Sequence, residues 1–136
     1  MQHIVLDTNC LIQSISPKSR FHIIWQSLFD GSYSLCISTE IIEEYHEILQ
    51  RLTNTKVTNY VMNALLYNPY TSFISPYYKF NLISADPEDN KFVDCAIAAN
   101  AKFIVTNDHH FDVLKHISFP RVEIINIEEF YSQLTV

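Results

Sequence analysis

Two segments that are expected to be strands each end close to an aspartate. Asp7 directly follows the apolar run 3–6, and Asp108 comes two residues after the run 102–106. An aspartate after a strand is commonly a turn or capping residue, so neither one is informative alone. Parallel strands present their carboxyl ends at one edge of a sheet, where ligands bind. The pair therefore predicts that both carboxylates contribute to one site.

A third carboxylate is suggested by helix geometry. Residues 38–52 are expected to form a helix with Ser38 as its N-cap. At about 100° per residue, Glu43 and Glu47 point away from the apolar stripe, whereas Glu44 lies at its border, about 90° from the centre. Glu44 is therefore the acid of this helix that can reach inward. The same border position also suits a side chain that extends into solvent.

A fourth carboxylate comes from the alanine-rich helix expected over residues 86–100. Asp94 lies in its interior, where aspartate is an unfavourable residue, on a face that it shares with small side chains. A carboxylate buried there needs a partner, and a metal ion is one such partner. Asp89 lies three residues after Asp86, the expected N-cap, and is interpreted as a helix-start residue that favours the dipole.

The chemistry that four carboxylates support is the binding of a hard cation. Oxygen ligands favour Mg²⁺ or Mn²⁺, whereas Zn²⁺ usually recruits His or Cys. His109 and His110 follow Asp108 and are interpreted as loop residues, although either could add a ligand. Divalent cations can activate water and stabilise the leaving oxygen of a phosphodiester without a Ser, His or Cys nucleophile.

The elements that must position these acids alternate between short strands and helices. This alternation predicts an α/β fold, a three-layer α/β/α sandwich with a mainly parallel central sheet, as a single domain over residues 1–136. The expected strands cover residues 3–6, 34–37, 81–84, 102–106 and 122–125. The expected helices cover residues 21–30, 38–52, 57–67, 86–100, 111–116 and 127–134, and residues 7–9 are expected to form a turn or a helix cap.

Composition constrains the function further. No apolar run is long enough to span a bilayer, and the scattered Cys10, Cys36 and Cys95 favour buried thiols in a reducing cytoplasm over disulfides or zinc. The net charge of −6 argues against nucleic-acid binding, unless bound cations reverse the local charge. Gly31 is the only glycine, which excludes a glycine-rich phosphate loop.

Taken in order, four short motifs resemble the PIN domain family. They are Leu-Asp-Thr-Asn at residues 6–9, the Ser-capped helix with Glu44, Asp-x-x-Ile-Ala-Ala-x-Ala at residues 94–101, and Thr-Asn-Asp at residues 106–108 followed by Phe111. The stretch 86–90 resembles a bacterial and archaeal branch of toxins from toxin–antitoxin systems. Each motif is weak alone, but together they extend over nearly the whole chain.

The resemblance implies a metal-dependent endoribonuclease that cleaves single-stranded or structured RNA, often as a homodimer, with an antitoxin protein as a possible partner. It assigns Asp7, Glu44, Asp94 and Asp108 to the acidic site, and Asn9 and Thr106 to the groups that orient the ligands, with Asp89 as a residue that can share the role of Asp94. Scattered basic residues are suggested as RNA contacts: Lys18, Arg20, Arg51, Lys56 and Lys79.

Two other readings remain open. A non-catalytic PIN module would bind RNA or a protein without cutting, and the acidic net charge slightly favours it. Another acid-edged α/β protein is the second alternative. A haloacid-type phosphatase, however, needs Asp-x-Asp where this chain has Asp7, Thr8 and Asn9, and a receiver domain needs a phosphoacceptor after its third strand and a later lysine.

Overall fold

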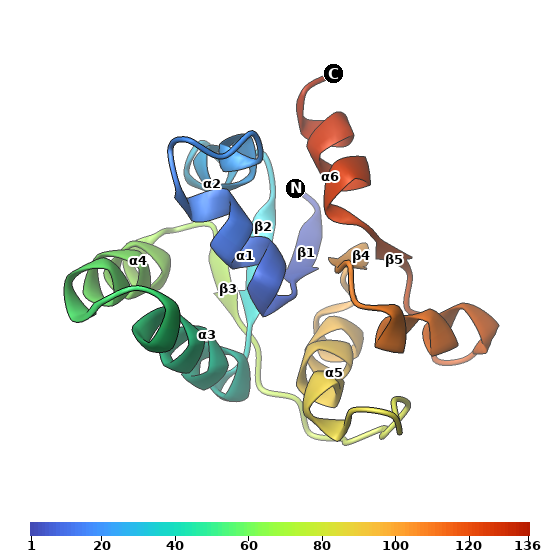
Figure 1. The fold of residues 1–136 in the computed structure, drawn as a ribbon. Helices are drawn as coiled ribbons and strands as arrows, with labels where there is room; N and C mark the ends of the chain where they lie inside the picture. Colours follow the sequence, from blue (N-terminus) through green and yellow to red (C-terminus); the bar gives the residue numbers. More distant parts are fainter.

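The computed structural model describes residues 1–136 and contains a five-stranded sheet whose neighbouring strands are all parallel (Figure 1). The strand order is β3-β2-β1-β4-β5. The strands are β1 (His3–Leu6), β2 (Ser34–Ile37), β3 (Thr71–Phe73), β4 (Phe103–Val105) and β5 (Ile124–Ile125). The predicted fold class, an α/β sandwich around a parallel sheet, is confirmed.

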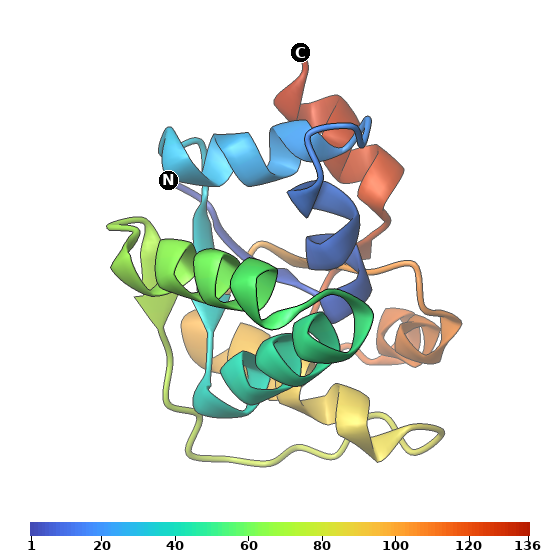
Figure 2. The same cartoon turned by 60° about the vertical axis from the view of Figure 1, so that its left-hand side comes forward.

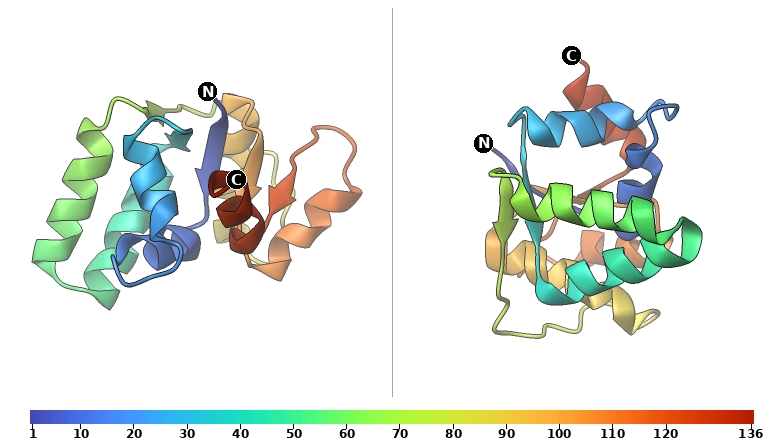
Figure 3. Two further views of the ribbon diagram at one scale, coloured as in Figure 1. Left: turned by 90° about the horizontal axis from the view of Figure 1, so that it is seen from above. Right: turned by 90° about the vertical axis from the view of Figure 1, so that its left-hand side faces the viewer.

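Helices cover both faces of the sheet. They are α1 (Thr8–Ile15), α2 (His22–Phe29), α3 (Thr39–Leu52), α4 (Thr55–Tyr67), α5 (Asn90–Ala99) and α6 (Ile127–Leu134), with 3₁₀ turns η1 (Pro87–Asp89) and η2 (His109–His116). Helix α5 packs on β1, β2 and β4, whereas α1, α2 and α6 lie on the opposite side (Figures 2 and 3). Helix α3 contacts both α1 and α5. None of the helices has the length and apolar composition that crossing a membrane requires.

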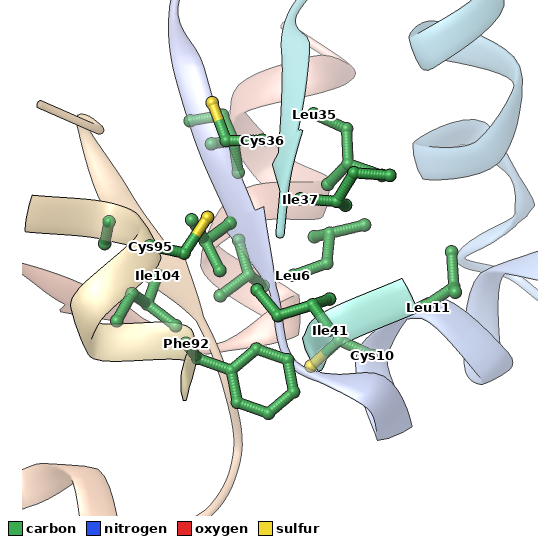
Figure 4. Close-up of a cluster of buried hydrophobic side chains, with 14 of the residues drawn as sticks. Leu6, Cys10, Leu11, Leu35, Cys36, Ile37, Ile41, Phe92, Cys95 and Ile104 are labelled. Atoms are coloured by element: carbon green, nitrogen blue, oxygen red, sulfur yellow. The ribbon is translucent and has the colours of Figure 1, made fainter. Parts of the chain in front are cut away.

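The core is one continuous cluster of buried hydrophobic side chains between α5, the sheet and α1 (Figure 4). All four residues of β2 are buried, which explains why this strand has an uninterrupted low-polarity sequence rather than an alternating one. Cys10, Cys36 and Cys95 are buried free thiols within this cluster, as predicted. The core therefore fixes the position of β1, from which Asp7 extends.

The structure corrects two expected elements. Residues 81–84 do not form a strand, because the side chain of Asn90 binds both the amide and the carbonyl of Ile83, at 2.9 and 2.8 Å, and takes the groups that a ladder would use. The fifth strand is instead β3, which pairs with β2. Residues 8–15 form a helix that was not expected, and Asp7 lies at its N-cap position, one of the two alternatives expected for residues 7–9. The Asp7 side chain makes no capping bond to it because that carboxylate is bound elsewhere.

The carboxyl end of β1 is anchored from both sides. The amide of Asp7 donates to the carbonyl of Val105 at 3.0 Å, which joins β1 to β4. The buried hydroxyl of Tyr45 on α3 donates to the carbonyl of Leu6 at 2.6 Å. Helix α3 is thus tied directly to the residue that precedes Asp7.

We expect Tyr45→Phe to lower the free energy of unfolding by about 1–3 kcal/mol, because a buried carbonyl loses its hydroxyl donor. Tyr60→Phe is the matched control, since Tyr60 is 67% exposed on α4 and makes no side-chain hydrogen bond. Urea unfolding followed by circular dichroism measures both. Equal stability of the two variants would contradict a role for this hydrogen bond in anchoring β1.

Candidate metal centre

Asp7 lies at the carboxyl end of β1 and is only 7% exposed. Its Oδ2 atom accepts a hydrogen bond of 2.8 Å from the hydroxyl of Thr106. The same Thr106 oxygen accepts a bond of 3.0 Å from the amide of Asp108. Thr106 therefore links the segments that carry the two aspartates predicted to share a site.

Glu44 reaches this region from α3, and each of its carboxylate oxygens has a partner. The hydroxyl of Thr8, the first residue of α1, donates to Oε2. The ammonium of Lys91 on α5 donates to Oε1 at 2.8 Å. Glu44 thus takes the inward of its two possible orientations, and its side chain is 22% exposed.

Asp89 lies in the turn η1, directly before α5, and belongs to the same acidic cluster. Its side chain is 13% exposed, yet its buried Oδ2 atom has no hydrogen-bond partner. Asp89 occupies the N-cap position of α5, as expected for a helix-start residue, but its side chain makes no capping hydrogen bond. The imidazole Nδ1 of His110 lies 3.6 Å from this Oδ2 atom and 3.4 Å from Oδ1 of Asp108. Ligand atoms of Asp86, Asp89 and His110 all lie within 4.8 Å of one another.

Asp94 is not brought together with the other predicted acids. It is buried, but its carboxylate accepts a hydrogen bond of 3.1 Å from the amide of Phe80. The charges that act on it come from Glu40 and Lys79, not from Asp7 or Asp108. The partner that a buried carboxylate requires is therefore a backbone amide, and Asp89 is the acid near α5 that faces the cluster.

Burial and mutual repulsion raise the pKa of two of the clustered acids. Burial, opposed by the hydrogen bond from Thr106 and reinforced by the charges of Glu44 and Asp108, raises the pKa of Asp7 to about 6. Burial and the charges of Asp86, Asp108 and Asp7 raise the pKa of Asp89 to about 7. A cation placed among these groups would relieve both effects. The oxygen-rich donor set and the unpartnered oxygen of Asp89 fit a hard divalent ion.

Other residues near the cluster differ from the sequence expectation. Asn9 is exposed and its side chain makes no hydrogen bond. Thr8 and Lys91 were not singled out as site residues, Asp86 was interpreted only as an N-cap, and His110 was interpreted as a loop residue that could add a ligand. The contact of Thr8 with Glu44 spans 36 positions in the chain, so only the tertiary structure reveals it. The signal for Lys91 was a lone basic residue two positions after the acids Asp86, Glu88 and Asp89.

The sequence profile of the PIN domain matches residues 3–110, which is most of the chain. The chain belongs to the PIN domain family. The motifs that suggested this family are therefore confirmed as a family signature. Among curated proteins, no sequence relative matches the chain.

Solved structures of PIN proteins share the fold at low sequence identity. VapBC2 from Rickettsia felis, bound to a DNA fragment from its promoter, has a TM-score of 0.64 and 19% identity, covering 91% of this chain and 98% of that chain. VapBC from Salmonella typhimurium, bound to DNA, has a TM-score of 0.59 and 16% identity, covering 93% and 99%. The PIN domain of human SMG5 has a TM-score of 0.57 and 16% identity, covering 96% and 97%.

The raised pKa values predict how the stability of the metal-free protein depends on pH. Between about pH 4 and pH 7 the folded state holds more protons on Asp7 and Asp89 than the unfolded state does, so the free energy of unfolding falls as pH rises. In the Asp89→Asn variant, we expect the free energy of unfolding to decrease less as the pH rises. Thermal unfolding in EDTA across this window measures it.

The matched control is Glu47→Gln, which removes an exposed acid from α3. The melting temperature of Glu47→Gln should decrease with rising pH by as much as that of the wild type. If the melting temperature of Asp89→Asn depends on pH as that of the wild type does, burial and the charged neighbours of Asp89 do not raise its pKa.

Proposed function

We propose that this protein is a metal-dependent endoribonuclease whose divalent cation, Mg²⁺ or Mn²⁺, is held by Asp7, Asp89 and Asp108, with Glu44 beside them. The observation that carries the proposal is the buried Oδ2 atom of Asp89, which has no hydrogen-bond partner in the acidic cluster. A buried carboxylate oxygen without a hydrogen-bond donor is costly, and a cation is a partner that suits it. Membership in the PIN family supports a nuclease function in general.

The chain's own residues have distinct roles in this proposal. Thr106 fixes the carboxylate of Asp7, while Thr8 and Lys91 fix that of Glu44. Burial limits the water that competes for the oxygens of Asp7. When bound, the cation supplies Lewis-acid stabilisation of phosphate charge and lowers the pKa of water. Because the pKa values of Asp7 and Asp89 are raised to about 6 and about 7, a cation bound beside them would displace the protons that these carboxylates hold at lower pH.

The biological role that best suits this enzyme is the toxin of a toxin–antitoxin pair. VapBC2 from Rickettsia felis and FitAcB from Neisseria gonorrhoeae are among the structures that share its fold. By analogy, the partners are RNA as substrate, an antitoxin protein and a second copy of the chain, in the cytoplasm. The analogy rests on fold alone, so the metal chemistry is to be tested before these partners.

We expect purified protein to cleave labelled single-stranded RNA with Mn²⁺ or Mg²⁺ and to lose this activity in EDTA. Asp7→Asn should lower the cleavage rate by about 100-fold or more, because a buried ligand is removed while the fold remains. Circular dichroism checks the fold of the variant. RNA that stays intact with every metal would favour the non-catalytic PIN module, and an unchanged rate for Asp7→Asn would exclude this site.

The assignment of the acid near α5 can be tested without catalysis. We expect Asp89→Asn to weaken Mn²⁺ binding by about tenfold or more, whereas Asp94→Asn should bind Mn²⁺ as the wild type does, because Asp94 is held by the amide of Phe80. Isothermal titration calorimetry measures both variants, which make the same chemical change five residues apart. Weaker Mn²⁺ binding by Asp94→Asn, with unchanged binding by Asp89→Asn, would show that Asp94 is the ligand.

A further inference from the structure

Lys91 is a cation placed inside the acidic site. It lies in the first turn of α5, two residues after Asp89, and its side chain is only 10% exposed. Its ammonium donates to Glu44 at 2.8 Å and to Glu88 at 3.2 Å. Lys91 is therefore a fixed positive charge next to the candidate metal ligands.

The same lysine also lines a cavity of about 250 Å³. The cavity lies between the start of α3 and the strap, the name used here for residues 74–86, which connect β3 to η1. Its lining is mostly polar and includes Ser38, Thr39, Glu40, Ser75, Tyr78, Lys79 and Asp94. The volume is just below the range of roughly 300–1,000 Å³ that small-molecule sites occupy. It suits one nucleotide unit rather than a larger ligand.

The strap presents aromatic side chains to solvent beside this cavity. Tyr77 is 92% exposed, Tyr78 is 75% exposed and Phe80 is 37% exposed. The rings of Tyr78 and Phe80 lie with their centroids 6.3 Å apart. Phe80 is tied down through its amide, which donates to the carboxylate of Asp94. Exposed rings beside a basic group are the combination by which proteins bind single-stranded nucleic acid.

We propose that this cavity binds the RNA nucleotide next to the cleaved bond, with Lys91 contacting its phosphate and Tyr78 stacking on its base. The proposal rests on the proposed nuclease function. Lys91 is shared by the acidic site and the cavity, so an RNA backbone that reaches the acids passes this ammonium. The carboxylates of Glu40 and Asp94 repel a phosphate but can accept hydrogen bonds from the N–H groups of a base. The base is therefore expected on the side of the cavity where these two residues lie. Lys79 adds a second positive charge to the lining.

A protein segment is the other chemical class that exposed aromatic residues can bind. The observations favour RNA because most of the residues that line the cavity are polar, two of them are lysines, and one of these lysines contacts Glu44. The experiment below distinguishes the two classes.

The test measures binding of a fluorescent single-stranded oligoribonucleotide in EDTA at several salt concentrations, where no cleavage takes place. We expect Lys91→Met to weaken binding about tenfold and to make the log–log salt slope less steep by about 0.7, the value for one phosphate contact on a single strand. Lys91→Arg should retain the wild-type slope. Tyr78→Ala should also weaken binding about tenfold, whereas Tyr78→Phe should not, because stacking needs only the ring.

Two controls separate a phosphate contact from other effects. Lys102→Met removes an exposed lysine next to the amino end of β4, at the opposite edge of the sheet, and should leave binding unchanged. Lys91→Met also leaves the charge of Glu44 unpaired, which could repel RNA by itself. The double variant Lys91→Met/Glu44→Gln should therefore bind as weakly as Lys91→Met if Lys91 touches the phosphate. If the double variant binds RNA with wild-type affinity, Lys91 does not contact the phosphate.

The remaining outcomes are equally decisive. Wild-type protein that does not bind RNA, or affinity that is insensitive to both Lys91 and Tyr78, would overturn the proposal and leave the strap as a surface for a protein partner. Binding that depends on both residues supports the subsite even if Mn²⁺ yields no cleavage, in which case only the nuclease function fails. The two hypotheses are thus tested by separate measurements on the same samples.

Discussion

Carboxylates that are gathered away from water repel one another, and the arrangement of this protein follows from how that repulsion is balanced. Asp7 receives a hydroxyl from Thr106, and Glu44 receives the ammonium of Lys91. Asp89 has no such partner for its buried oxygen. The acids remain together because each is attached to an element that the core or a neighbouring helix fixes in place. The least compensated of them is the one at which a cation is most strongly needed.

Much of this arrangement could be predicted because it depends on local rules. Short apolar strands that alternate with helices specify a parallel sheet, and such a sheet brings Asp7 and Asp108 to one edge. Ser38 could be recognised as an N-cap, and it does accept a hydrogen bond from the amide of Ile41. The angular position of Glu44 on its helix left an inward and an outward orientation open, and the side chain takes the inward one.

The rest depends on contacts that sequence patterns do not encode. Asp89 and Asp94 are both acids near the start of α5, and choosing between them requires knowing where the strap runs, since the amide of Phe80 satisfies Asp94. Residues 81–84 of the strap were expected to form a strand. They do not, because the backbone amide and carbonyl of Ile83 are hydrogen-bonded to the side chain of Asn90. Long-range pairs such as Thr8 with Glu44 become visible only when the fold is assembled.

The strap has a consequence for how such proteins diverge. It contains no helix or strand, and two side chains of α5, Asp94 and Asn90, hold its backbone at Phe80 and Ile83. Asp7 and Glu44, by contrast, extend from β1 and α3, and Asp89 lies just after the strap, at the start of α5. Loops of this kind accept substitutions and changes in length with little effect on the framework. Natural selection can therefore reshape the surface around the acidic site while the framework that holds Asp7 and Glu44 is inherited unchanged.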